Sequence, residues 1–146
     1  MSAKEITKAL ITTLQKETFE FIVCNFANLD LVGHSGNYQS TIRAVEVIDD
    51  CLAKLIPQAI EHGYTVLITG DHGNAEYMLY DDGTPCPSHT KNPVPCIICG
   101  PEISKENTPL RTDGALYDVA PTILEILGIK QPKEMTGRSL FLNKLK

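Results

Sequence analysis

The sequence has 146 residues, of which 42% are hydrophobic and 21% charged, the size and composition of one globular domain. Thirteen Lys and Arg against eighteen Asp and Glu give a net charge of −5, which argues against binding to nucleic acid or to anionic membrane surfaces. The apolar runs are far shorter than a membrane span, no apolar signal segment is present, and the five cysteines resemble reduced thiols. We therefore expect one domain, residues 1–146, in a cytoplasmic protein.

The first half of the chain predicts two helices and a strand. Residues 2–16 begin with a capping-box pattern and carry an apolar stripe, so they predict an amphipathic helix. The β-branched and aromatic run Phe19–Asn25 predicts a strand covered on both faces, followed by a loop rich in Asn, Asp and Gly. Apolar residues at spacings of three and four predict a helix over Tyr38–His62. We expect Pro57 to kink or end its regular part, and Gly63 to cap it.

The second half predicts two more strands and one helix. Thr65–Thr69 and Val94–Cys99 are apolar runs bounded by glycines and turn residues, which is typical of buried strands. Asp118 is placed to cap a last helix that ends at Gly128. Strand, helix and strand in this order form a βαβ unit, so we expect an α/β fold with a mostly parallel sheet and helices on both faces.

Three groups of polar residues follow predicted strands and have the chemistry of metal ligands. These groups contain Asp30 with His34, Asp71 with His72, and His89. Carboxylate oxygens together with imidazole nitrogens suit Mn²⁺, Zn²⁺ or Co²⁺, whereas Mg²⁺ and Ca²⁺ prefer oxygen alone. Five ligands exceed one closed tetrahedral site and indicate two adjacent ions, an arrangement used in phosphoryl displacement.

Plainer interpretations compete at each of these positions. Asp and Gly are favoured in turns, so a single Asp-His-Gly after a strand is more often a turn than a ligand pair. His62 follows a helix, where a positive side chain is ordinary, and we interpret it as structural. Cys96 and Cys99 match the C-x-x-C pattern, but alternation along a strand points their sulfurs to opposite faces, which disfavours a redox role.

Several segments resemble the cofactor-independent phosphoglycerate mutases of the alkaline phosphatase superfamily. Asn25–Gly36 looks like the family's N-F-A-N-x-D-M-V-G-H-T-G, and Asp71–Glu76 looks like its D-H-G-N-A-E. The resemblance continues through Ser88–Pro95, Asp118–Leu124 and Glu134–Leu140, and it covers almost the whole chain. The Asp-His-Gly piece alone indicates only the superfamily, whereas the Asn-Ala-Glu extension is specific to the mutases.

The resemblance implies a three-layer, alkaline-phosphatase-like domain, of which residues 1–146 are the C-terminal metal-binding part. It implies that Asp30, His34 and His89 hold one Mn²⁺, with Zn²⁺ or Co²⁺ as alternatives, and that Asp71 and His72 contribute to a second. The family's nucleophilic Ser and its substrate-binding domain are expected outside this chain, so no catalytic residue is assigned here and the substrate-binding residues are unknown.

The implied activity is that of a glycolytic isomerase, which interconverts 3-phosphoglycerate and 2-phosphoglycerate through a phosphoserine intermediate. We expect the chain to be inactive alone, because a substitute nucleophile such as Ser35, Ser88 or Thr90 would need metal coordination or a base. The alternatives are a non-catalytic metal-binding remnant or interaction module, and another metal-dependent phosphohydrolase or phosphomutase. An incomplete sheet would leave an unpaired edge, so we also expect self-association or association with the missing N-terminal part.

Overall fold

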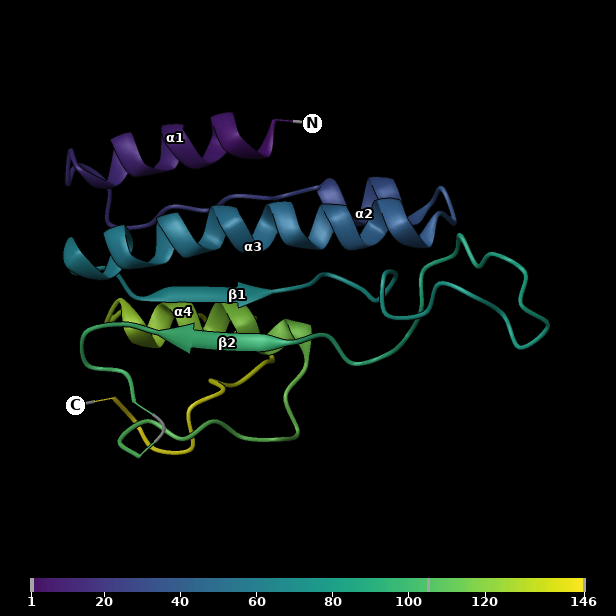
Figure 1. The fold of residues 1–146 in the computed structure, drawn as a ribbon. Helices are drawn as coiled ribbons and strands as arrows, with labels where there is room; N and C mark the ends of the chain where they lie inside the picture. Colours follow the sequence, from purple (N-terminus) through teal and green to yellow (C-terminus); the bar gives the residue numbers. More distant parts are fainter. Residues whose placement is uncertain (1, 105, 146) are drawn as a thin grey trace.

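A computed structural model describes residues 2–104 and 106–145, and its helices and strands lie in layers (Figure 1). Helix α1 lies along α3, which contacts β1 on its other side, and α2 also packs against α3. No helix in the described residues is both long enough and apolar enough to span a bilayer. The elements in chain order are α1 (Ala3–Leu14), α2 (Asn28–Gly33), α3 (Tyr38–Glu61), β1 (Val66–Thr69), β2 (Cys96–Cys99), the 3-10 helix η1 (Leu116–Asp118) and α4 (Val119–Ile126).

The sheet of the described residues has two strands, and they are antiparallel. Val66 pairs with Cys99 at one end of the ribbon, and Thr69 pairs with Cys96 at the other. The long connection between the strands, which extends to the right in Figure 1, turns the chain back on itself. This is a correction to the predicted mostly parallel arrangement, because β2 returns beside β1 without a crossover helix.

The predicted strand Phe19–Asn25 is wrong within the described chain. The segment is extended, but a strand is defined by hydrogen bonds to a neighbour, and no described residue pairs with it. The exposed fractions of Phe19, Phe21 and Val23 are 57%, 52% and 82%. The predicted βαβ unit is therefore absent from residues 2–104 and 106–145. The Tyr64 hydroxyl donates to the Phe19 carbonyl at 2.6 Å and holds one end of this extended segment.

Helix α2 occupies residues that the sequence predicted as a loop. Its N-cap residue, Ala27, offers no capping side chain, and Gly33 has low helix propensity, so the local signal is weak. The hydrogen bonds from the N–H of Leu31 to the Ala27 carbonyl and from the N–H of His34 to the Asp30 carbonyl, both 3.1 Å, nevertheless form the turn. The packing of α2 against α3 supplies the stabilisation that local propensity does not.

Helix α3 agrees closely with its prediction. It begins after Asn37, whose side-chain oxygen accepts from the N–H of Ser40 at 2.9 Å. It continues through Pro57 to Glu61, so the proline does not end it. Gly63 follows with φ +79°, the left-handed conformation that commonly closes a helix, as predicted.

Side-chain capping is absent at the starts of α1 and α4. Ser2 makes no capping hydrogen bond, so the predicted capping box is not formed. The Asp118 carboxylate does not cap α4 but is buried under the C-terminal segment, where it accepts from the N–H groups of Ala115 at 3.0 Å and Arg138 at 2.8 Å. The Arg111 guanidinium also donates to it at 2.5 Å. Asp118 therefore fixes the C-terminal segment against α4.

Candidate metal centre

Asp30 and His34 are brought to one face by α2. Residues four apart on a helix are neighbours, and the distance between Asp30 Oδ1 and His34 Nε2 is 3.3 Å. The sequence predicted a loop at these residues, yet it is helix α2 that sets the spacing of the pair. Both side chains are partly exposed, at 37% and 43%.

His89 joins this pair from the long connection between β1 and β2. Its Nε2 lies 3.0 Å from Asp30 Oδ1 and 3.0 Å from His34 Nε2. The three side chains form a cluster with the geometry to hold a metal ion. The structure thus brings together three of the five residues predicted as ligands, from segments 59 residues apart in sequence.

The donor atoms of this cluster fit a divalent cation. Ligand atoms about 2.1 Å from a common ion at tetrahedral angles are about 3.4 Å apart, close to the observed separations. His34 Nδ1 donates to the Pro87 carbonyl at 2.7 Å, since a carbonyl oxygen can only accept. In the neutral ring this leaves the lone pair of His34 on Nε2, which faces the other two donor atoms. Two imidazoles and a carboxylate of this kind suit Mn²⁺, Zn²⁺ or Co²⁺.

Asp71 and His72 lie beside the cluster. The His72 ring stacks on the His89 ring with a centroid distance of 3.7 Å, and its Nε2 is 3.9 Å from Asp30 Oδ1. Asp71 Oδ2 is 3.6 Å from His72 Nε2, and the Asp71 side chain is 81% exposed. The pair is adjacent to the three-residue cluster but not part of it, so its role as a second set of ligands stays a prediction.

The Asp30 carboxylate is held in its charged form. A hydrogen bond from Asn74 Nδ2 to Asp30 Oδ1, at 3.0 Å, is the main cause that lowers the pKa of Asp30. Burial opposes this shift, while the nearby His34, His89 and His72 rings favour it. An anionic oxygen is therefore directed at the position where the imidazole nitrogens converge.

Sequence reasoning missed the polar residues that support the cluster. Glu76 accepts from the N–H of Asn74 at 2.7 Å, from Asn92 Nδ2 at 3.0 Å and from the hydroxyl of Thr90. Burial would raise the pKa of Glu76, but these hydrogen bonds together lower it. The sequence does contain a signal, because Asn74 and Glu76 follow closely after Asp71 and His72. This Asn-Ala-Glu stretch served only as a marker of the family.

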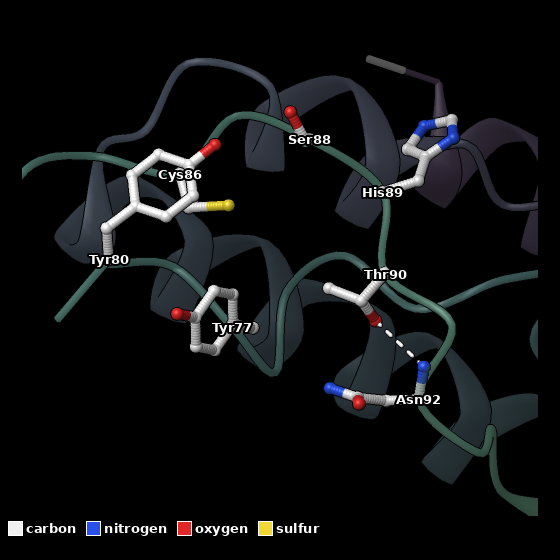
Figure 2. Close-up of a pocket in the computed structure, with 7 residues that line it drawn as sticks. All are labelled: Tyr77, Tyr80, Cys86, Ser88, His89, Thr90 and Asn92. Carbon is white, nitrogen blue, oxygen red and sulfur yellow. Dashed lines mark hydrogen bonds between the residues drawn. The ribbon is translucent and has the colours of Figure 1, made fainter.

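A cavity of about 320 Å³ lies next to His89. Figure 2 shows Tyr77 and Tyr80 on one side of it and His89 on the other, with Thr90 Oγ1 accepting from the N–H of Asn92. Tyr77 and Tyr80 meet edge to face at 6.3 Å. Its lining residues are Tyr77, Tyr80, Cys86, Ser88, His89, Thr90 and Asn92.

Other residues singled out in the sequence have local partners. His62 Nδ1 lies 3.0 Å from Glu17 Oε1, and neither residue belongs to the cluster, which is consistent with a structural role. The Ser35 hydroxyl donates to the Val32 carbonyl at 2.6 Å. All five cysteines, including Cys96 and Cys99, are free thiols.

Comparison with known proteins identifies the family. The model of the metalloenzyme superfamily matches residues 1–131. The chain belongs to the metalloenzyme superfamily. Among superfamily relatives, a 2,3-bisphosphoglycerate-independent phosphoglycerate mutase from Nostoc punctiforme is 52% identical over 145 residues, and one from Synechococcus sp. (strain JA-2-3B'a(2-13)) is 50% identical. Each match covers 96% of this chain and 27% of the relative.

A solved structure gives the same result for the fold. The phosphoglycerate mutase of Leishmania mexicana, determined at low cobalt concentration, superposes with a TM-score of 0.85 at 31% sequence identity. The match covers 97% of this chain and 28% of that protein. These comparisons confirm the resemblance to cofactor-independent phosphoglycerate mutases and the alkaline-phosphatase-like character of the fold. The chain spans about a quarter of the length of these relatives.

Proposed function

We propose that this chain serves as the C-terminal metal-binding part of a cofactor-independent phosphoglycerate mutase, a glycolytic isomerase of the cytoplasm that interconverts 3-phosphoglycerate and 2-phosphoglycerate. The observation that carries the proposal is the convergence of Asp30, His34 and His89 on one point. It is supported by the match to relatives of that name over 96% of the chain.

In this proposal Asp30, His34 and His89 hold one Mn²⁺, and Asp71 and His72 contribute to a second. A divalent ion there supplies Lewis-acid polarisation of phosphoryl oxygens. The residues of this chain hold the donor atoms in place: α2 fixes the Asp30–His34 spacing, and the Pro87 carbonyl orients the His34 ring.

The remaining functions fall to the rest of a longer mutase. Two of the hydroxyls beside the cluster are engaged, because Ser35 donates to a backbone carbonyl and Thr90 donates to Glu76. We therefore propose that the nucleophile and the substrate-binding groups come from the part of the mutase that this chain does not match. We further propose that in the longer mutase Phe19–Asn25 joins a larger, mostly parallel sheet of a three-layer fold. Its backbone is extended, and no described residue pairs with it.

The metal site is tested by counting bound ions. Elemental analysis after dialysis against Mn²⁺ should find about one tightly bound ion per chain, and His89→Ala should lose it. His62→Ala is the matched control, because His62 pairs with Glu17 and lies outside the cluster, and it should keep the ion. Equal loss in both variants, or no ion in the wild-type chain, would contradict the proposed site.

The activity is tested in a chimera. In it, the 146 residues replace the matching quarter of the Nostoc punctiforme mutase, and the conversion of 3-phosphoglycerate is measured. We expect turnover in the chimera and in its His62→Ala variant, and loss of turnover in its His89→Ala variant. An inactive but folded chimera that still binds Mn²⁺ would favour a non-catalytic metal-binding module.

A further inference from the structure

The segment Asn74–Glu76 contacts both of the elements that carry the metal cluster. Asn74 Nδ2 donates to Asp30 Oδ1 at 3.0 Å, so it contacts the half of the cluster carried by α2. Glu76 accepts from Asn92 and Thr90, so it contacts the connection that carries His89. Asn74 and Glu76 therefore form a short brace between the helix that carries Asp30 and the connection that carries His89. These two ligands are 59 residues apart in sequence.

The Asn74 amide is oriented so that its donor, Nδ2, faces Asp30. Asn74 is 5% exposed, and its Oδ1 is the buried side-chain polar atom without a hydrogen-bond partner in the described residues. An unpaired buried acceptor costs about 1–3 kcal/mol. Rotating the amide would direct this oxygen at the Asp30 carboxylate, where two acceptors would repel. The observed orientation therefore keeps the hydrogen bond from Nδ2 to Asp30 and leaves Oδ1 without a partner in the described residues.

Glu76 holds the His89 segment through hydrogen bonds from Thr90 and Asn92. Its carboxylate also accepts from the N–H of Asn74 at 2.7 Å, so it joins two stretches of the connection between β1 and β2. The N–H of Thr90 also donates to the Gly73 carbonyl at 2.8 Å. Because Thr90 directly follows His89, these bonds fix the backbone from which the His89 ring projects.

Two glycines make room for this brace. A Cβ on Gly33 would lie 2.5 Å from Asn74 Oδ1, and one on Gly73 would overlap Thr90 Oγ1 and Glu76 Oε1. The close approach at both ends thus depends on the absence of a side chain.

We infer that Asn74 and Glu76 are positioning residues that set the metal affinity of the site through different ligands, Asn74 through Asp30 and Glu76 through His89. The inference rests on the proposed metal site. Removing an outer partner of a metal ligand typically costs 10–100-fold in affinity, and that is the expected size of each effect.

The test is the dissociation constant of Mn²⁺, measured by isothermal titration calorimetry on the full chain. Asn74→Ala and Glu76→Gln should each raise it by about 10–100-fold. Asn107→Ala and Glu102→Gln change the same residue types at exposed positions and should leave it within about twofold. Thr90→Ser keeps the hydroxyl and should retain affinity, whereas Thr90→Val should behave like Glu76→Gln.

Double variants separate positioning from a general loss of structure. Thr90→Val combined with Glu76→Gln should weaken binding no more than Glu76→Gln alone, because both substitutions break the same hydrogen bond. Asn74→Ala combined with Glu76→Gln should weaken binding further, because the two residues act through different ligands. A multiplied effect of the Thr90 and Glu76 substitutions would overturn the inference, as would an unchanged affinity in either single variant.

A metal-free measurement distinguishes failure of this inference from failure of the proposed function. In ¹H–¹⁵N spectra of the histidine rings, Glu76→Gln should shift the His89 resonances and leave those of His62 in place. If the wild-type chain bound no Mn²⁺, the proposed function would fail, and these spectra would still decide the positioning role. Unshifted His89 resonances would overturn it.

Discussion

Replacing Thr122 by Val removes two buried hydrogen bonds without changing the side-chain shape. Thr122 is 0% exposed, and its hydroxyl donates to the Asp118 carbonyl at 2.7 Å and accepts from the N–H of Leu140 at 2.8 Å. Losing a neutral bond costs about 0.5–1.5 kcal/mol, and leaving the buried Leu140 N–H unpaired costs about 1–3 kcal/mol. We expect Thr122→Val to lower the free energy of unfolding by about 2–3 kcal/mol.

The effect is measured by urea and thermal unfolding followed by circular dichroism. For a chain of this size the expected loss lowers the melting temperature by roughly 5–10 °C. Thr12→Val is the matched control, because its exposed hydroxyl makes the same type of bond, to the Lys8 carbonyl at 3.0 Å, and it should change stability by less than about 0.5 kcal/mol. Equal effects of the two substitutions would refute the argument that the Leu140 contact is the decisive one.

Three further predictions concern contacts of buried residues. The pKa of Asp118 is lowered, since its hydrogen bonds outweigh burial, so its contribution to stability is present above about pH 4, the unfolded value, and is lost as pH falls below it. The stability difference between wild type and Asp118→Asn, followed by acid titration of unfolding, should therefore shrink toward pH 3, and a constant difference would contradict this. Gly137→Ala should destabilise the chain by more than about 2 kcal/mol in urea unfolding, because the added Cβ overlaps the Tyr117 carbonyl, a backbone atom. Gly33→Ala should displace Asn74 and weaken Mn²⁺ binding in calorimetry, whereas the exposed control Asn107→Ala should keep the wild-type affinity.

Local patterns predicted the long helix and the positions of both paired strands. The apolar spacing over Tyr38–His62 became α3, which ends one residue earlier, and Thr65–Thr69 became β1. Val94–Cys99 became β2, shortened by two residues at its start. Helical periodicity and short apolar runs are properties of neighbouring residues, so a sequence alone reveals them.

Pairing between distant segments was not predictable in the same way. The run Phe19–Asn25 has the composition of a buried strand, but no described residue pairs with it, and β1 pairs with the strand that follows it along the chain. Composition reports the preference for an extended backbone, whereas sheet formation depends on which partner is available. Helix α2 shows the converse, because packing against α3 creates a helix where local propensity is weak.

The candidate site, too, was predictable only in part. The ligand types at Asp30, His34 and His89 were evident because Asp and His residues stood beside predicted strand ends. The brace formed by Asn74 and Glu76 was not, since Asn74 reaches Asp30 across 44 residues and Glu76 reaches Thr90 across 14. Hydrogen bonds of this kind depend on how two loops fold together, which single-residue chemistry does not specify.

The extended segment between α1 and α2 has the backbone shape in which proteases bind their substrates. Phe19 and Phe21 are more than half exposed, and large aromatic side chains of this kind are what a chymotrypsin-like protease selects. Cleavage after either residue would cut the covalent link between α1 and the metal-binding elements. The N-terminal piece would then remain attached through the packing of α1 against α3 and through the contacts of Glu17 with His62 and of Phe19 with Tyr64. The stretch that forms no strand here is thus a position at which limited digestion would divide the chain.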